Sequence, residues 1–200
     1  EWGDLVDCLF LTPKYFNGRY AVTPATYKTD GMKCPSCGSI TDSQSCRKCN
    51  RQREKVTIEK PWDTKASQCA EWESAQSPRT IIKHKIFGPA CDAVKVLESY
   101  LGLKAIRDTS QRQVMATATY QDSETGIVVP IGILIDLLPA VDSPWGKSII
   151  DLKTTTTAAM RPWRSHVYTY NYDAQAALYL DVWTVTTGED RCDFRHIVQE

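Results

Sequence analysis

Two apolar runs joined by a short loop constrain the fold of this chain more than any other feature. Residues 127–138 and 147–153 are rich in isoleucine, valine and leucine, a composition that predicts two strands. The loop of about eight residues between them indicates that these strands are antiparallel neighbours. A β-rich segment at 113–120, followed by turn residues at 122–126, places one more strand before them. We therefore expect a hairpin that continues into a third strand.

Helical patterns surround this sheet in the sequence. Apolar residues at positions 2, 5, 6, 9 and 10 predict a helix over 2–12. We expect further helices over 61–76, with Asp63 or Thr64 as N-cap, and over 85–101. From about 158 the chain turns helical again, first over 158–163 and then over 172–185, with Gly188 at the end. The apolar side of the helix at 85–101 would consist of Ala90, Val94, Val96, Leu97 and Leu101. With short strands at 19–23 and 193–199, the pattern predicts an α/β fold.

Composition bounds the class of protein. The chain has 200 residues, of which 42% are hydrophobic, so a sizeable core can form. Its 24 basic and 24 acidic residues argue against a nucleic-acid partner unless the charges are segregated. No apolar run approaches the length of a membrane span and the sequence shows no signal-peptide pattern, so we expect a cytoplasmic location and no membrane partner. The chain starts without Met, and we expect a single domain, 1–200, trimmed at both ends.

Four of the eight cysteines are clustered. Cys34, Cys37, Cys46 and Cys49 form two Cys-x-x-Cys pairs separated by eight residues. Two such pairs can supply the four sulfur ligands of a closed tetrahedral zinc site, so the sequence predicts a zinc-binding insertion over 31–52 with a structural role. An iron–sulfur cluster uses the same four thiolates and is the alternative.

Basic residues follow the cysteines closely. Five of them lie within nine positions, interrupted by one acid at 54: Arg47, Lys48, Arg51, Arg53 and Lys55. Such a run is either a solvated charged surface or a set of contacts to DNA phosphates, which depend on charge and not on base sequence.

The strand acids carry the candidate chemistry. Asp151 and Lys153 share one face of a strand at a spacing of about 7 Å, and Asp136 can come alongside across the hairpin. Two converging carboxylates repel each other unless a hard cation such as Mg²⁺ or Mn²⁺ lies between them. The carbonyl of Leu152 is a possible further ligand, and Lys153 can stabilise charge on a phosphate. The alternative is structural, since acids at strand ends often cap turns.

Three more residues have two interpretations each. Gln175 and Tyr179 are four positions apart, so they share one face of the last helix and either pack there or contact DNA phosphate. Asp7 lies inside the first apolar helix, either on its solvent side or directed at the acids of the strands.

The order of these residues resembles the PD-(D/E)xK nuclease superfamily, and within it the exonuclease VIII (RecE)-like and lambda-exonuclease-like phage recombination nucleases. Four motifs carry the resemblance: Gly3-Asp-Leu-Val-Asp7, then Asp136, then Asp151-Leu-Lys153, then Gln175-Ala-Ala-Leu-Tyr179. The segments around them, Leu9 to Phe16, Ile149 to Thr155 and Tyr172 to Asp181, are similar to the RecE type as well. The chain departs from the family pattern at Asp7, where many relatives have His, and in the four-cysteine segment.

The resemblance implies a restriction-endonuclease-like core, in which helices flank a central mixed sheet, with a small zinc-knuckle insertion. It implies an ATP-independent exonuclease that uses Mg²⁺ or Mn²⁺ on the ends of double-stranded DNA for recombination. Asp136, Asp151 and Lys153 would be catalytic, supported by Gln175 and Tyr179. A homo-oligomer and a single-strand annealing protein are the implied partners.

Two other functions stay open. One is a helicase-linked or CRISPR-adaptation nuclease whose four cysteines hold an iron–sulfur cluster. The other is a non-catalytic nucleic-acid-binding module built on the zinc knuckle.

Overall fold

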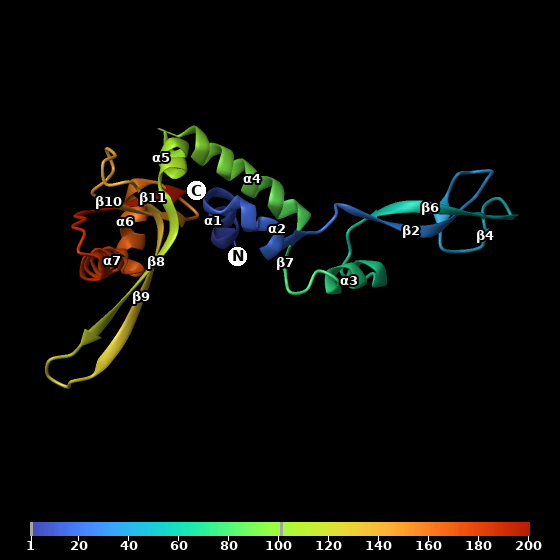
Figure 1. The fold of residues 1–200 in the computed structure, drawn as a ribbon. Coiled ribbons are helices and arrows are strands. Elements are labelled where there is room, and N and C mark those ends of the chain that lie inside the picture. The colour runs from blue at the N-terminus through green and yellow to red at the C-terminus, as the bar shows by residue number, and fades with distance from the viewer. Residues whose placement is uncertain (1, 101) are drawn as a thin grey trace. The chain divides into compact units, whose positions relative to one another are not determined.

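The computed structural model describes residues 2–100 and 102–200, and it is a mixed α/β structure with several sheets (Figure 1). The chain divides into two compact units. Unit 1 combines Glu1–Phe16 with Pro89–Glu200, and unit 2 consists of Asn17–Gly88. The cysteine segment predicted as an insertion over 31–52 thus belongs to a larger compact unit.

A four-stranded mixed sheet, in the order β11-β10-β9-β8, is the framework of unit 1. Its strands are β8 (Gln111–Gln121), β9 (Val128–Leu138), β10 (Ser148–Thr154) and β11 (Asp193–Gln199). The predicted hairpin is confirmed, because β8 and β9 pair antiparallel. The predicted antiparallel contact between β9 and β10 is also confirmed, through Ile150 and Leu137. The last strand, β11, runs parallel to β10 along its whole length.

Helices pack against this sheet. The helices and turns of unit 1 are α1 (Trp2–Leu11), η1 (Pro13–Tyr15), α5 (Leu103–Thr109), α6 (Met160–Thr169) and α7 (Tyr172–Thr187). Val182 and Trp183 of α7 join the buried cluster formed by Ala116, Ile133, Ile135, Leu138 and Ile149 of the strands. The two helical segments predicted from about 158 and over 172–185 correspond to α6 and α7, and Asn171, whose φ of 53° breaks the helical path, separates them. Gly188, with φ of 73°, ends α7 as expected.

Helix α1 supplies a second apolar layer. Leu5, Val6, Phe10 and Leu11 are fully buried, which confirms the predicted helix, but Trp2, which was predicted on the same apolar face, is 36% exposed. The buried guanidinium of Arg107 donates a hydrogen bond of 3.4 Å to the carbonyl oxygen of Phe10. It also forms an ion pair of 2.6 Å with Glu98, so this charge is compensated inside the unit.

Unit 2 is built from small sheets. Strand β1 (Tyr20–Val22), predicted at 19–23, pairs parallel with β7 (Thr80–Ile82). An eight-residue antiparallel ribbon, β2 (Thr26–Lys33) with β6 (Glu54–Pro61), leads to the cysteine segment and was not predicted. The remaining elements of unit 2 are β3 (Ile40–Thr41), β4 (Ser45–Cys46), β5 (Arg51–Gln52) and α3 (Ser67–Ser74). The division between the units falls inside α2 (Phe16–Arg19) and inside α4 (His84–Ser99).

Two details of the predicted helices are wrong. Helix α3 begins at Ser67 after Ala66, which provides no side-chain cap; Asp63 instead accepts a hydrogen bond from the backbone N–H of Lys65 in the turn before the helix. In α4, Val96 is 57% exposed and does not line the packed side, which Ala90, Ala93 and Leu97 form. Leu101 lies outside the described residues.

Within residues 2–100 and 102–200, no helix combines the length and the apolar character needed to cross a membrane.

Candidate functional site

Asp136 reaches from β9 to the neighbouring strand β10. Ile135 and Leu138, which lie on either side of it in the sequence, belong to the buried cluster of unit 1. The Asp136 carboxylate accepts a hydrogen bond of 2.8 Å from the backbone N–H of Leu152 on β10. The N–H and C=O of one strand residue point to the same side, so the Leu152 carbonyl also faces Asp136.

Gln113 holds the other oxygen of Asp136. Its side-chain amide donates a hydrogen bond of 2.7 Å to Asp136 Oδ1. The flanking pairs, Arg112 with Leu137 and Val114 with Ile135, place Gln113 opposite Asp136. Gln113 has a φ of 53°, a left-handed conformation that costs a non-glycine residue about 1–2 kcal/mol. Strained backbone of this kind concentrates at functional sites.

Asp151 lies at the centre of a polar network. It is only 4% exposed, and its Oδ2 is 2.8 Å from Lys153 Nζ. His196 Nδ1 lies 3.1 Å from the same oxygen, and the amide of Gln175 donates a 3.5 Å bond to Oδ1. His196 reaches this position because β11 pairs with β10 in a register that sets His196 beside Asp151.

Asp7 brings a third carboxyl group to the same place. Burial, and then the charges of Asp136 and Asp151, raise the pKa of Asp7 to about 7. Its Oδ1 is buried and has no hydrogen-bond partner among the described residues. Burial also raises the pKa of Asp136 to about 6, against the hydrogen bond from Leu152, with Asp151 adding to the increase.

Close packing of α1 on β10 positions Asp7. A Cβ atom at Gly3 would lie 2.8 Å from Thr154 Oγ1, a distance that allows no side chain without movement. Gly3 is one helical turn before Asp7, so the close approach at Gly3 carries Asp7 toward the strand that holds Asp151.

The acids fit a hard divalent cation in their chemistry. Mutually repelling carboxyl groups and one buried oxygen without a partner are features that a cation satisfies. The oxygens of Asp7, Asp136 and Asp151 do not all lie within 4.8 Å of one another, since the four cysteines form the one group among the described residues that meets this spacing. A magnesium ion commonly takes one or two carboxylates and keeps several waters.

Tyr179 lies away from this network. Its ring packs edge-on against Phe194 at 5.8 Å between centroids and lies against the buried cluster of the sheet. The residue four positions earlier, Gln175, reaches Asp151. The two residues that sequence places on one helix face therefore have different surroundings.

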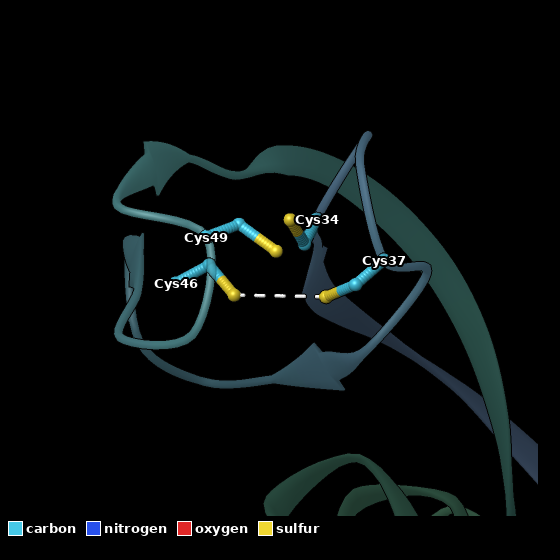
Figure 2. Close-up of side chains that lie close together, drawn as sticks. All are labelled: Cys34, Cys37, Cys46 and Cys49. Carbon is cyan, nitrogen blue, oxygen red and sulfur yellow. Dashed lines mark hydrogen bonds between the residues drawn. The ribbon is translucent and has the colours of Figure 1, made fainter.

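The four cysteines come together at the end of the ribbon in unit 2. Cys34 lies after β2, Cys46 ends β4, and the sulfurs of Cys34, Cys37, Cys46 and Cys49 all lie within 4.8 Å of one another (Figure 2). Cys37 and Cys46 are 3.7 Å apart. This cluster is compatible with a structural zinc ion, as predicted from the spacing.

Hydrogen bonds shift the pKa values of three of these thiols. A hydrogen bond from Ser39 lowers the pKa of Cys37, and the backbone N–H of Cys49 lowers the pKa of Cys46 to about 6. The side chain of Cys37, followed by burial, raises the pKa of Cys49 to about 12. Negative charge is thus concentrated on some sulfurs and opposed on another, and a bound cation would favour the thiolate at all four.

The five basic residues near the cluster are not equivalent. Arg47, Lys48 and Arg51 are exposed. Arg53 is half-buried and donates hydrogen bonds to the carbonyl oxygens of Met32 and Ser39, at 3.3 and 3.1 Å. Lys55 pairs with Asp30 at 2.7 Å. Arg53 therefore connects the loops that carry the cysteines. The ion pair of Lys55 lies on the exposed surface of the ribbon, where such pairs contribute little to stability.

His196 and Gln113 are the site residues that sequence reasoning missed. His196 belongs to a strand that was predicted, but its role depends on the parallel pairing of that strand with β10. Gln113 begins a predicted strand, and nothing in the sequence marks its left-handed backbone. The available signal was that Phe194 and His196, two positions apart, share one face of the predicted strand.

No model of a known protein family matches this chain, and no match is found among curated proteins.

Proposed function

We propose that this chain is a metal-dependent deoxyribonuclease that hydrolyses phosphodiester bonds at the ends of double-stranded DNA. The observation that carries the proposal is electrostatic. Asp7, Asp136 and Asp151 come from three separate elements, yet burial and then the charges of Asp136 and Asp151 raise the pKa of Asp7. Lys153 lies 2.8 Å from Asp151 in the same site.

Asp136, Asp151 and the Leu152 carbonyl would bind the cation. Asp7 would add a further negative charge beside it. When bound, Mg²⁺ or Mn²⁺ supplies a water of lowered pKa and neutralises charge on the phosphate. Gln113 and the N–H of Leu152 orient Asp136. Gln175 and His196 orient Asp151 in the same way.

Lys153 would act on the phosphate itself. Its side chain is 19% exposed, so the ammonium group can reach a substrate while it stays close to Asp151. In the proposed complex it donates hydrogen bonds to a phosphate oxygen whose negative charge grows as the attacking water adds. Tyr179 contributes through packing of α7.

The strand order supports a restriction-endonuclease-like core for unit 1, with an antiparallel β8-β9-β10 meander and a parallel β11. From the resemblance we further propose ATP-independent exonuclease activity in recombination, a homo-oligomer, and a single-strand annealing protein as partner. Zinc in the cysteine cluster would be structural, and Arg47, Lys48 and Arg51 would contact DNA phosphates.

A nuclease assay on end-labelled linear duplex tests the proposal. The wild-type protein with Mg²⁺ or Mn²⁺ should release labelled nucleotides, and Asp151→Ala or Lys153→Ala should lower the rate by at least about 100-fold. Asp142→Ala and Lys104→Ala change one exposed acid and one exposed base and should retain activity. Intact ends with both metals would refute the proposal.

A second function is favoured by the exposed Arg47, Lys48 and Arg51 beside the cysteine cluster. A non-catalytic module would bind the same duplex without cutting it, and Asp151→Ala would not change its affinity. The helicase-linked or CRISPR-adaptation alternative would show iron and visible absorption in the purified protein, whereas a zinc protein is colourless.

A further inference from the structure

A cavity in unit 2 lies beside the cysteine cluster. It has a volume of about 390 Å³ and reaches Cys46, one of the four clustered cysteines. Three of its lining residues are basic, and four carry hydroxyl groups: Ser39, Thr41, Ser43 and Ser45. No described carboxylate lines it. Hydroxyl and cationic groups both donate hydrogen bonds, so the lining of this cavity is suited to an anion.

The basic residues of the cavity, Arg47, Lys48 and Arg53, carry positive charge that no carboxylate balances. None of them forms an ion pair within residues 2–100 and 102–200. Arg53 is half-buried, and its Nη1 donates to the carbonyl oxygens of Met32 and Ser39. Its Nε is buried and has no hydrogen-bond partner among the described residues. Neutral acceptors leave the charge of this guanidinium group uncompensated.

Zinc in the cysteine cluster would balance only part of this positive charge. A zinc ion held by four thiolates has a net charge of about −2. The three cations of the cavity exceed that charge, so an anion would still be attracted to the cavity when zinc is bound.

Two of the hydroxyl groups are free to donate to a ligand. Ser45 is exposed, and its Oγ forms no hydrogen bond with any residue in the described part of the chain. Thr41 Oγ1 accepts the backbone N–H of Ser43 at 3.3 Å, which leaves its own proton available. The other two are engaged, since Ser43 Oγ donates to the carbonyl oxygen of Ser45 at 3.1 Å and Ser39 Oγ lies 3.2 Å from Cys37 Sγ.

A phosphate monoester matches this set of donors. It carries a charge of about −1.5 to −2 at pH 7 and has three terminal oxygens that accept hydrogen bonds. A diester of the DNA backbone has less charge and one terminal oxygen fewer. The sugars on both sides of a diester also hinder its entry into a concave site, whereas a monoester can enter with its free end first.

We propose that this cavity binds a phosphate monoester. Thr41 and Ser45 donate hydrogen bonds to its terminal oxygens, and Arg47, Lys48 and Arg53 neutralise its charge. This binding differs from contact between basic residues and the DNA backbone, because it requires the hydroxyl groups and a terminal phosphate. The site does not depend on the nuclease function proposed for unit 1.

Isothermal titration calorimetry of the zinc-loaded chain, in buffer without Mg²⁺ or Mn²⁺, tests the site. The probes are thymidine 5′-monophosphate, inorganic phosphate and thymidine. The first two should bind with a Kd below about 1 mM, and thymidine, which lacks the phosphate, should not bind. Absence of saturable binding of both phosphate ligands up to about 10 mM would overturn the inference.

Two dinucleotides identify the source of the monoester. TpT has a single diester and no monoester, whereas pTpT has a terminal monoester as well. Displacement of thymidine 5′-monophosphate by pTpT alone would support the site and show that nucleic-acid ends can occupy it. Displacement by neither would support a site for free monoesters. Equal displacement by both would show that any nucleic-acid phosphate binds there and would overturn the inference.

Variants of the lining locate the binding. Ser45→Ala and Lys48→Ala should each weaken binding of thymidine 5′-monophosphate by about 10-fold, because each removes a hydrogen bond to a charged group. Ser36→Ala and Arg51→Ala are the matched controls and should keep the wild-type affinity, since both residues are exposed in the same segment and neither lines the cavity. Elemental analysis should find the wild-type zinc content in all four variants, so that a loss of affinity is not a loss of the cluster.

Lys153→Ala separates the cavity from the acidic site of unit 1 and should bind thymidine 5′-monophosphate as the wild type does. Wild-type affinity in both Ser45→Ala and Lys48→Ala, or loss of binding in Lys153→Ala, would overturn the inference even if the protein cuts DNA. Binding that depends on Ser45 in a protein that never cuts DNA would refute only the nuclease function.

Discussion

Asp7 should make the stability of unit 1 fall as the pH rises in the absence of divalent metal. Its folded-state pKa of about 7 exceeds the ordinary value of 3.8, so the folded protein holds this proton more tightly than the unfolded chain does. The contribution to stability is complete below about pH 4 and is lost as the pH rises through about 7. Three pKa units correspond to about 4 kcal/mol. This is an upper value, because Asp136 ionises in the same window, with a pKa of about 6.

The substitution Asp7→Asn removes this ionisation with little change in size. Above about pH 7 the free energy of unfolding of the variant should exceed that of the wild type by up to about 4 kcal/mol. Below about pH 4 the two proteins should have the same free energy of unfolding. Urea denaturation across this range measures the difference. Tryptophan fluorescence reports unit 1 if Trp62 and Trp72, which belong to unit 2, are first replaced by Phe.

The control for this experiment is Asp142→Asn, an exposed acid in the loop before β10, which should follow the wild-type curve. Addition of Mg²⁺ near pH 8 should stabilise the wild type more than Asp7→Asn, because the cation relieves repulsion that the variant lacks. Equal stability of the wild type and Asp7→Asn at high pH, with parallel curves, would show that Asp7 is not held against the other carboxylates.

Two further predictions concern the cysteine cluster and the strained residue. Cys46→Ser should reduce zinc from about one ion per chain to a small fraction, measured by elemental analysis, whereas Cys192→Ser, outside the cluster, should retain it; equal zinc in both would contradict the assignment. Gln113→Gly should be more stable to urea than Gln113→Ala by about 1 kcal/mol, because only glycine adopts the left-handed backbone freely. At an ordinary strand position the order would be reversed.

Sequence patterns predicted the sheet of unit 1 well because its strands are long and apolar. The hairpin of β8 and β9 and the neighbouring β10 are confirmed, as are the helical start of the chain and the final strand. The ribbon of β2 and β6 escaped prediction because one of its faces is exposed, the other is mostly only half-buried, and its strands are rich in charged residues. Its stability comes from pairing and from the cysteine loops, neither of which leaves an apolar pattern.

Some features of the candidate site can be predicted from the sequence, and others cannot. Chemistry that depends on residue type and spacing, such as the four cysteines or the Asp151 and Lys153 pair, is visible in the sequence. Contacts that depend on register are not. His196 approaches Asp151 only because β11 is parallel to β10, and Gln113 meets Asp136 only through a local departure from strand geometry.

The missing Cβ atom of Gly3 affects the position of Asp7, one helical turn further along α1. With no Cβ at this position, α1 settles against β10 until its backbone is nearly in contact with Thr154 Oγ1. Asp7 follows one turn of about 5.4 Å later on a rigid helix. A larger residue at position 3 would tilt α1 or move it away from β10. The distance between the carboxyl groups of Asp7 and Asp151 would then increase.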